Sequence, residues 1–155
     1  FPVTACDISD SRWRGTVYVL WSDQRNGKDN TDIFLLKSKD NGDSWAEIIR
    51  VNNDAGGRHQ FFPWITVDPV TGIIYVVFYD RRATEYNETE VWMARSDDGG
   101  ESFSNFRISE TAFIPLEFIF FGDYINVAAR NGRVHPIWMR MDGTKRSIWT
   151  AVIRE

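Results

Sequence analysis

The sequence has little of several features that mark particular protein classes. Its 155 residues include one cysteine, Cys6, so no internal disulfide framework can form, and we expect Cys6 to be a small buried residue of an inner strand. No apolar run approaches the roughly 20 residues of a membrane-spanning helix, so no membrane partner is expected. The net charge is −4, without a lysine-rich tail or an arginine stripe, which argues against a nucleic-acid partner. No segment shows the 3.6-residue apolar rhythm of an amphipathic helix.

What the sequence does contain is a repeat. The segment Ser38-Lys-Asp40-Asn-Gly42-Asp-Ser-Trp45 is matched 58 residues later by Ser96-Asp-Asp98-Gly-Gly100-Glu-Ser-Phe103. Apolar runs that begin at Gly15, Gly72 and Gly132 are 57 and 60 residues apart. A third series precedes these runs, at 2–7, 63–68 and 123–128. Three series with one period predict a repeat architecture.

Each repeat contains four short strands. In the middle unit we expect strands at about 62–68, 73–80, 90–96 and 103–108, separated by turn residues. Seven Trp, five Tyr and eleven Phe suit a pleated surface. Four strands in a period near 58 favour an all-β propeller, whose blades are four-stranded sheets around an axis. The predicted blades span about 1–52, 61–109 and 121–155.

The predicted propeller is partial, with one domain over 1–155. Its last blade lacks an outermost strand, and three blades leave sheet faces uncovered. We therefore expect about three more blades, which would make six, from the same polypeptide or from a second copy of this chain. The sequence begins at Phe1 without a signal-peptide pattern, so we expect any targeting segment to lie upstream.

Both eight-residue segments follow Ser-x-Asp-x-Gly-x-x-aromatic, which resembles the Asp box of bacterial neuraminidase repeats (BNR). The Asp carboxylate accepts backbone N–H bonds across the turn, the Gly takes a positive φ and the aromatic fills the gap beneath. The resemblance implies a secreted or cell-surface sialidase-like protein with a carbohydrate ligand and no cofactor. It also implies that the box residues are structural: Ser38, Asp40, Gly42, Trp45, Ser96, Asp98, Gly100 and Phe103. A Phe/Tyr-Arg-Ile-Pro segment, typical of true sialidases, is absent from the sequence. A calcium site at Asp40–Asp43 would have too few ligands, so no metal is expected.

Charged loops of both signs gather at the end of the blades opposite the boxes. In the family, this end surrounds a depression where ligands bind. The substrate-binding candidates there are Arg25, His59, Gln60, Trp64, Arg81, Arg82 and Arg140. Asp23-Gln-Arg25 and Asp80-Arg-Arg82 occupy the same place in consecutive blades, which favours a structural Asp–Arg pair over a ligand role. Arg81 lies outside that pair and is the better candidate for an anionic sugar.

Three further candidates lie close to the axis. His59 and Gln60 directly precede an inner strand, although a histidine at this rim also serves as an ordinary hydrogen-bonding residue. Trp64 is placed to stack on a sugar ring. Tyr124 is the catalytic candidate, because sialidases use a tyrosine nucleophile and Tyr124-Ile-Asn-Val127 followed by Asn131-Gly132 is similar to the family pattern. The alternative is that Tyr124 packs the central channel.

Three functions remain open at this point. The first is a carbohydrate-active enzyme, a glycoside hydrolase acting on an anionic or complex glycan. The second is a propeller without catalysis that binds glycans or proteins, and the third is a structural repeat module. Convergence of arginines on one point, with Tyr124 within about 3 Å of a carboxylate base, would separate the first two.

Overall fold

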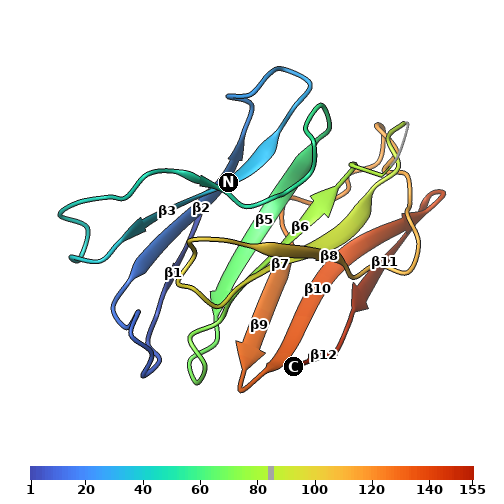
Figure 1. Ribbon diagram of the computed structural model, residues 1–155. Helices are drawn as coiled ribbons and strands as arrows, with labels where there is room; N and C mark the ends of the chain where they lie inside the picture. The colour runs from blue at the N-terminus through green and yellow to red at the C-terminus, as the bar shows by residue number, and fades with distance from the viewer. Residues whose placement is uncertain (84–85) are drawn as a thin grey trace.

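The computed structural model describes residues 1–83 and 86–155, and its regular structure is entirely β-strand. The strands form three antiparallel sheets (Figure 1). The first sheet has the order β1-β2-β3-β4, with bounds Val3–Cys6, Val17–Asp23, Asp32–Ser38 and Ile49–Arg50. The second has the order β5-β6-β7-β8, with bounds Gln60–Val67, Ile74–Asp80, Glu90–Ser96 and Ser104–Arg107. The predicted all-β architecture of four-stranded sheets is confirmed.

The third sheet consists of β9, β10, β11 and β12, with bounds Asn126–Arg130, Arg133–Asp142, Lys145–Thr150 and Ile153–Arg154. β11 and β12 both pair with the edge of β10 that is opposite β9. They do so in one register, since Ile137 pairs with Thr150 and Val134 with Ile153. Between these pairs lies Pro136, which has no N–H for the ladder. β11 and β12 are therefore two parts of one outer strand, interrupted at a proline.

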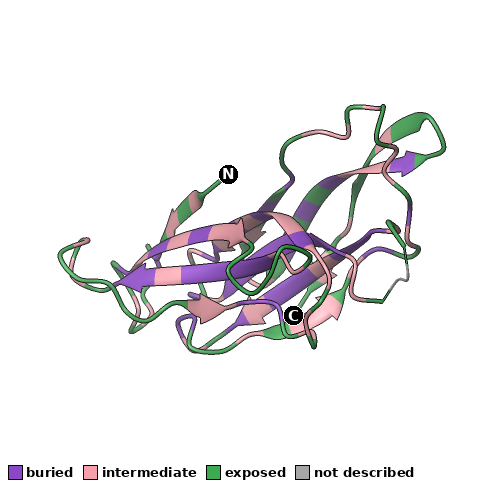
Figure 2. Ribbon diagram, turned by 90° about the horizontal axis from the view of Figure 1, so that it is seen from above, coloured by how far each residue is buried: buried purple, intermediate pink, exposed green. Residues whose placement is uncertain are grey.

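The middle sheet is buried on both faces. All seven residues of β6 are buried, and they alternate between two apolar layers. The layer against the first sheet receives Ile74, Val76 and Phe78. The layer against the third sheet receives Tyr75, Val77 and Tyr79. Figure 2 shows this burial along the central strands, while most exposed residues lie in loops and outer strands.

The first strands of the three sheets lie side by side. β5 contacts both β1 and β9, as expected for the inner strands of a propeller (Figure 1). Each sheet then runs outward from this inner strand. No helix in the described part of the chain is long and apolar enough to cross a membrane.

The two Ser-x-Asp-x-Gly turns have the same hydrogen bonds. In the second sheet, Asp98 accepts the Ser96 hydroxyl at 2.7 Å and the Ser102 backbone N–H at 3.0 Å, while Gly100 N donates to Ser96 Oγ at 2.9 Å. In the first sheet, Asp40 accepts the equivalent bonds at 2.8 and 2.9 Å. Hydrogen bonds from Ser44 and Ser38 lower the pKa of Asp40 to about 2. The carboxylate thus holds each turn closed in its ionised form.

Two residues predicted to be buried are exposed. Phe103 packs against the core between the first and second sheets, but Trp45, at the same place in the first repeat, is 43% exposed. Cys6 is also exposed, because Val3 and Ala5 take the core side of β1 and leave Cys6 on the other side. In both cases no second sheet covers that side of the first sheet within the described residues.

Candidate functional site

The predicted ligand-binding loops share one end of the three sheets. Because neighbouring strands are antiparallel, the loops after β2, β6 and β10 lie at the same end as the connections that lead into β5 and β9 (Figure 1). The Ser-x-Asp-x-Gly turns lie at the other end. We call the end with the loops after β2, β6 and β10 the rim.

Arg25 and Arg82 form ion pairs within their own loops. Arg25 Nη2 lies 2.6 Å from Asp23 Oδ2, and Arg82 Nε lies 2.7 Å from Asp80 Oδ2. In both loops the arginine backbone N–H also donates to the same aspartate. The bonds from Arg25 hold the pKa of Asp23 well below its usual range. Each loop therefore contains the Asp–Arg pair that the recurrence favoured.

Each of these arginines also stacks on an aromatic ring of the next strand. The guanidinium of Arg25 lies 4.3 Å from the Phe34 ring centre, and that of Arg82 lies 4.1 Å from the Trp92 ring centre. Contacts of this kind are worth about 0.5–1 kcal/mol at exposed sites. The pairs and stacks fix both arginines as parts of the loop structure.

Arg140 takes part in the same arrangement with the charges exchanged. Arg140 follows Trp138 by two positions, as Asp23 follows Trp21, and it pairs with Asp142 at 2.9 Å. Its guanidinium lies 4.9 Å from the Trp149 ring centre and donates to the Thr111 hydroxyl at 2.7 Å. The sequence reading did not identify this pair, although the spacing from the strand tryptophan was the signal that would have found it.

Gln60 belongs to a buried network between the first two sheets. It is fully buried, accepts a hydrogen bond from Asn52 at 2.9 Å and donates to Asp80 at 3.2 Å. Asn52 also donates to Asp32 at 2.6 Å. These polar groups satisfy one another, so the network joins the two sheets. Gln60 therefore belongs to the contact between the two sheets and has no atoms exposed at the rim.

His59 and Arg81 line one hollow at the rim end of β5. The Arg81 backbone N–H donates to the His59 carbonyl at 3.1 Å, which holds the two residues together. The hollow has a volume of about 360 Å³ and is lined by Asp29, Gly57, Arg58, His59, Arg81, Tyr86 and Asn87. A second hollow of about 300 Å³ also uses His59 and Arg81, together with Thr31 and Phe61.

Several contacts position these two side chains. His59 Nδ1 lies 2.9 Å from the Thr31 hydroxyl, and Arg81 Nε donates to the Thr89 hydroxyl at 3.2 Å. The Arg81 guanidinium lies 5.1 Å from the Phe61 ring centre, and partial burial lowers the pKa of Arg81. Next to Phe61 the chain bulges, with Phe62 at a φ of 50°. Such left-handed conformations in residues other than glycine are costly and cluster at functional sites.

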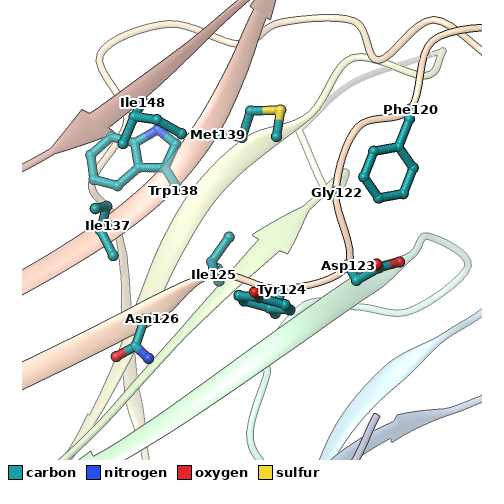
Figure 3. Close-up of a pocket in the computed structure, with 10 residues that line it drawn as sticks. All are labelled: Phe120, Gly122, Asp123, Tyr124, Ile125, Asn126, Ile137, Trp138, Met139 and Ile148. Atoms are coloured by element: carbon teal, nitrogen blue, oxygen red, sulfur yellow. The ribbon is translucent and has the colours of Figure 1, made fainter.

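Tyr124 lines a different hollow, on the third sheet. This space of about 420 Å³ is bounded by Phe120 and residues 122–126 on one side and by Ile137, Trp138, Met139 and Ile148 on the other (Figure 3). Tyr124 is 73% exposed, and its ring centre lies 6.2 Å from that of Trp64. Within the described residues no hydrogen bond joins its hydroxyl to a carboxylate, and its hollow shares no lining residue with that of Arg81.

The described residues contain no group of three or more His, Cys, Asp or Glu side chains placed to hold a metal ion.

This chain resembles solved structures in its fold, but its sequence matches no known family. No family model and no curated protein matches the sequence. The α-L-arabinanase of Penicillium chrysogenum, solved in complex with arabinobiose, matches 98% of this chain with a TM-score of 0.70 and 16% identity. The Hadza microbial sialidase Hz136 matches 99% of it with a TM-score of 0.57 and 15% identity.

A third structure is Zg3597, a family 117 glycoside hydrolase of the marine bacterium Zobellia galactanivorans. It matches 96% of the chain with a TM-score of 0.53 and 12% identity. The chain spans 45%, 45% and 51% of these three structures, respectively. At such identities the likeness concerns the fold. The chain has the fold of about half of a propeller glycosidase.

Proposed function

We propose that this chain binds a carbohydrate at its rim, and that the hollow around His59 and Arg81 receives an anionic group of that carbohydrate. The proposal depends on one observation: a guanidinium and an imidazole, joined through their backbones, line one hollow at the rim end of an inner strand. The fold likeness to glycosidases supports the class of ligand, since one of these structures holds arabinobiose.

The surroundings of Arg81 favour a negatively charged group. Arg81 lies against the Phe61 ring and is partly withdrawn from water. A charge in such a place interacts more strongly with a counter-charge than it would in bulk solvent. The planar guanidinium also matches the two oxygens of a carboxylate. An acidic sugar therefore fits this hollow better than a neutral one.

Hydrolysis with Tyr124 as nucleophile is the second candidate function. Tyr124 is exposed, lies two residues before inner strand β9 and is near Trp64, which packs against the core between the second and third sheets. A tyrosine nucleophile needs a base within about 3 Å. Asp123 lines the same hollow, but within the described residues no hydrogen bond joins a carboxylate to the Tyr124 hydroxyl. Binding is thus the function that the geometry supports best, and catalysis would need groups from elsewhere.

Calorimetric titration with sialyllactose and with neutral lactose tests the binding proposal. We expect the acidic sugar to bind more tightly and Arg81→Ala to weaken it at least tenfold, roughly the value of one charge-assisted contact. Arg81→Lys, which keeps the charge but not the fork, should fall between the two. Arg14→Ala is the matched control, because Arg14 is a solvent-exposed arginine that pairs with Asp10 in the β1–β2 hairpin at the opposite end.

Two results would contradict this function. If Arg81→Ala and the unchanged chain bind each sugar with the same affinity, the hollow around Arg81 is not the site. Absence of any glycan binding would favour the structural-module hypothesis. Tyr124→Phe tests the second candidate function, which is hydrolysis. If Tyr124 is the nucleophile, the substitution should abolish turnover of a sialoside while leaving the affinity for it unchanged.

A further inference from the structure

The His59 ring is held at one of its two nitrogens, which leaves the other for a group in the hollow. His59 Nδ1 lies 2.9 Å from the Thr31 hydroxyl, and that hydroxyl also accepts a hydrogen bond from the Gln24 amide at 3.2 Å. Within the described residues no hydrogen bond joins His59 Nε2 to another side chain. The ring lines both hollows at the rim end of β5, and Arg81 lines both with it.

The contact with Thr31 suits both charge states of the ring. In a neutral imidazole one nitrogen donates and the other accepts, so Nδ1 and the Thr31 hydroxyl can share a hydrogen in either direction. A protonated imidazole has an N–H at both nitrogens. Because a hydroxyl has two acceptor lone pairs, Thr31 can accept from Nδ1 while it also accepts from Gln24. Protonation of His59 therefore costs no hydrogen bond and gives Nε2 a charged N–H.

Charged and titratable groups reach this hollow from three loops. Among the described residues they are Asp29 of the β2–β3 loop, Arg58 of the β4–β5 connection, and Arg81, Tyr86 and Glu88 of the β6–β7 loop, where Glu88 follows the lining residue Asn87. The Asp29 carboxylate is largely exposed and lies 3.8 Å from the Lys28 ammonium. All of these groups surround His59 whether or not a ligand is bound.

An anionic sugar group changes this balance by one negative charge. A negative charge close to an imidazole favours its protonated form over its neutral form. The backbone bond of 3.1 Å between Arg81 N–H and the His59 carbonyl keeps the two residues at the same hollow. An anion that binds Arg81 is therefore also close to the His59 ring.

We propose that an acidic sugar binds in this hollow together with one proton, which the His59 ring takes up from solvent. The inference rests on the proposed function, because it concerns the same anionic group beside Arg81. The proton goes to the imidazole when the sugar binds and returns to solvent when the sugar leaves, and no bond of the sugar is broken. The affinity should therefore rise as the pH falls, and the sugar should be released as the pH rises.

The range from pH 5.5 to pH 8 isolates the imidazole. A histidine changes its charge in this range, whereas carboxylates and guanidiniums keep theirs. The Ser-x-Asp-x-Gly turns also stay closed, because the pKa values of Asp40 and Asp98 are about 2. A change in affinity across this range thus reports the ring and not a loss of these turns.

Calorimetric titration of the full 155-residue chain with sialyllactose tests the proposal. We expect the affinity to be at least about tenfold higher at pH 5.5 than at pH 8, roughly the difference between a charge-assisted and a neutral contact. At pH 7 the heat of binding should depend on the ionisation enthalpy of the buffer, because the buffer supplies the proton. His59→Gln should bind equally at both pH values and should show no dependence on the buffer.

His135→Gln is the matched control. His135 is the other histidine of the sequence, is exposed on β10 and lines a different hollow, so this variant should bind like the unchanged chain at every pH. NMR of the unchanged chain gives a second measurement that no variant affects. The titration midpoint of the His59 imidazole should move to higher pH when sialyllactose is added, whereas that of His135 should not move.

The outcomes separate this inference from the function on which it rests. Absence of sialyllactose binding at every pH would overturn both. Binding that is equally tight at pH 5.5 and pH 8, a pH dependence that persists in His59→Gln, or an unmoved His59 midpoint would overturn the proton uptake and leave the sugar site in place.

Discussion

Gly99 provides a quantitative test of how the first two sheets pack. A Cβ atom at this position would lie 2.4, 2.5 and 2.8 Å from three ring atoms of Trp13. Trp13 belongs to the β1–β2 hairpin of the first sheet, whereas Gly99 lies in the Ser-x-Asp-x-Gly turn of the second. The Gly99 carbonyl also accepts a hydrogen bond from the Lys37 ammonium at 3.0 Å. The rigid ring and the turn are therefore held against each other.

The cost of Gly99→Ala has two parts. Gly99 has a φ of +72°, and a residue with a Cβ pays about 1–2 kcal/mol to adopt it. Overpacking against the ring adds about 1–3 kcal/mol. The sum is about 2–5 kcal/mol. Gly15→Ala is a matched control, because Gly15 has a φ of +86° with no atom within 4 Å of its Cβ, and its cost should be about 1–2 kcal/mol.

Urea denaturation at one protein concentration, followed by tryptophan fluorescence, measures both costs. In a Trp13→Ala background the overlap disappears, so Gly99→Ala should then cost no more than Gly15→Ala. If Gly99→Ala costs no more than Gly15→Ala while Trp13 is present, the packing of Trp13 over the turn is refuted, and with it this part of the sheet stacking.

Three further results are expected. Tyr79→Phe should lower the free energy of unfolding by about 1–2 kcal/mol in urea, because the hydroxyl donates to the Met139 carbonyl at 2.8 Å and accepts its N–H at 3.1 Å. Lys37→Met should lower it by about 1–3 kcal/mol, since the buried ammonium is the partner of the Gly99 carbonyl; an unchanged value would contradict the contact. Burial opposes ionisation of Asp98, but hydrogen bonds from Ser102 and Ser96 lower its pKa from 3.8 to about 2. Its stabilisation is therefore present above pH 3.8 and is lost as the pH falls through 2, so Asp98→Asn should flatten the acid side of a stability–pH curve.

The repeat predicted the fold because strand positions follow from local patterns. The middle sheet was predicted at 62–68, 73–80, 90–96 and 103–108, and its observed strands differ by no more than two residues at either end. The break between β11 and β12 was missed, although Pro136 is visible in the sequence. A proline interrupts a ladder only where its missing N–H points to a neighbour, and that depends on the register with β11.

The rim was predicted less completely, because it depends on contacts between repeats. The Asp80–Arg82 pair is local and follows from spacing. The burial of Gln60 depends on Asn52, from the preceding connection, and on Asp80, from the next strand. The period of the repeat does not indicate that the side chains of Gln60, Asn52 and Asp80 contact one another. The placement of Tyr124 in a hollow apart from Arg81 has the same origin, since the connection before β9 sets it.

The complete burial of β6 has a consequence for the order in which this molecule opens. Amide protons exchange with solvent through local unfolding, and the outer sheets each shield one side of this strand. The hydrogens of Tyr75 to Tyr79 should therefore exchange last, after those of β4 and β12 at the periphery. Unfolding would proceed inward from both flanks, and the central strand would be the last part of the native structure to disappear.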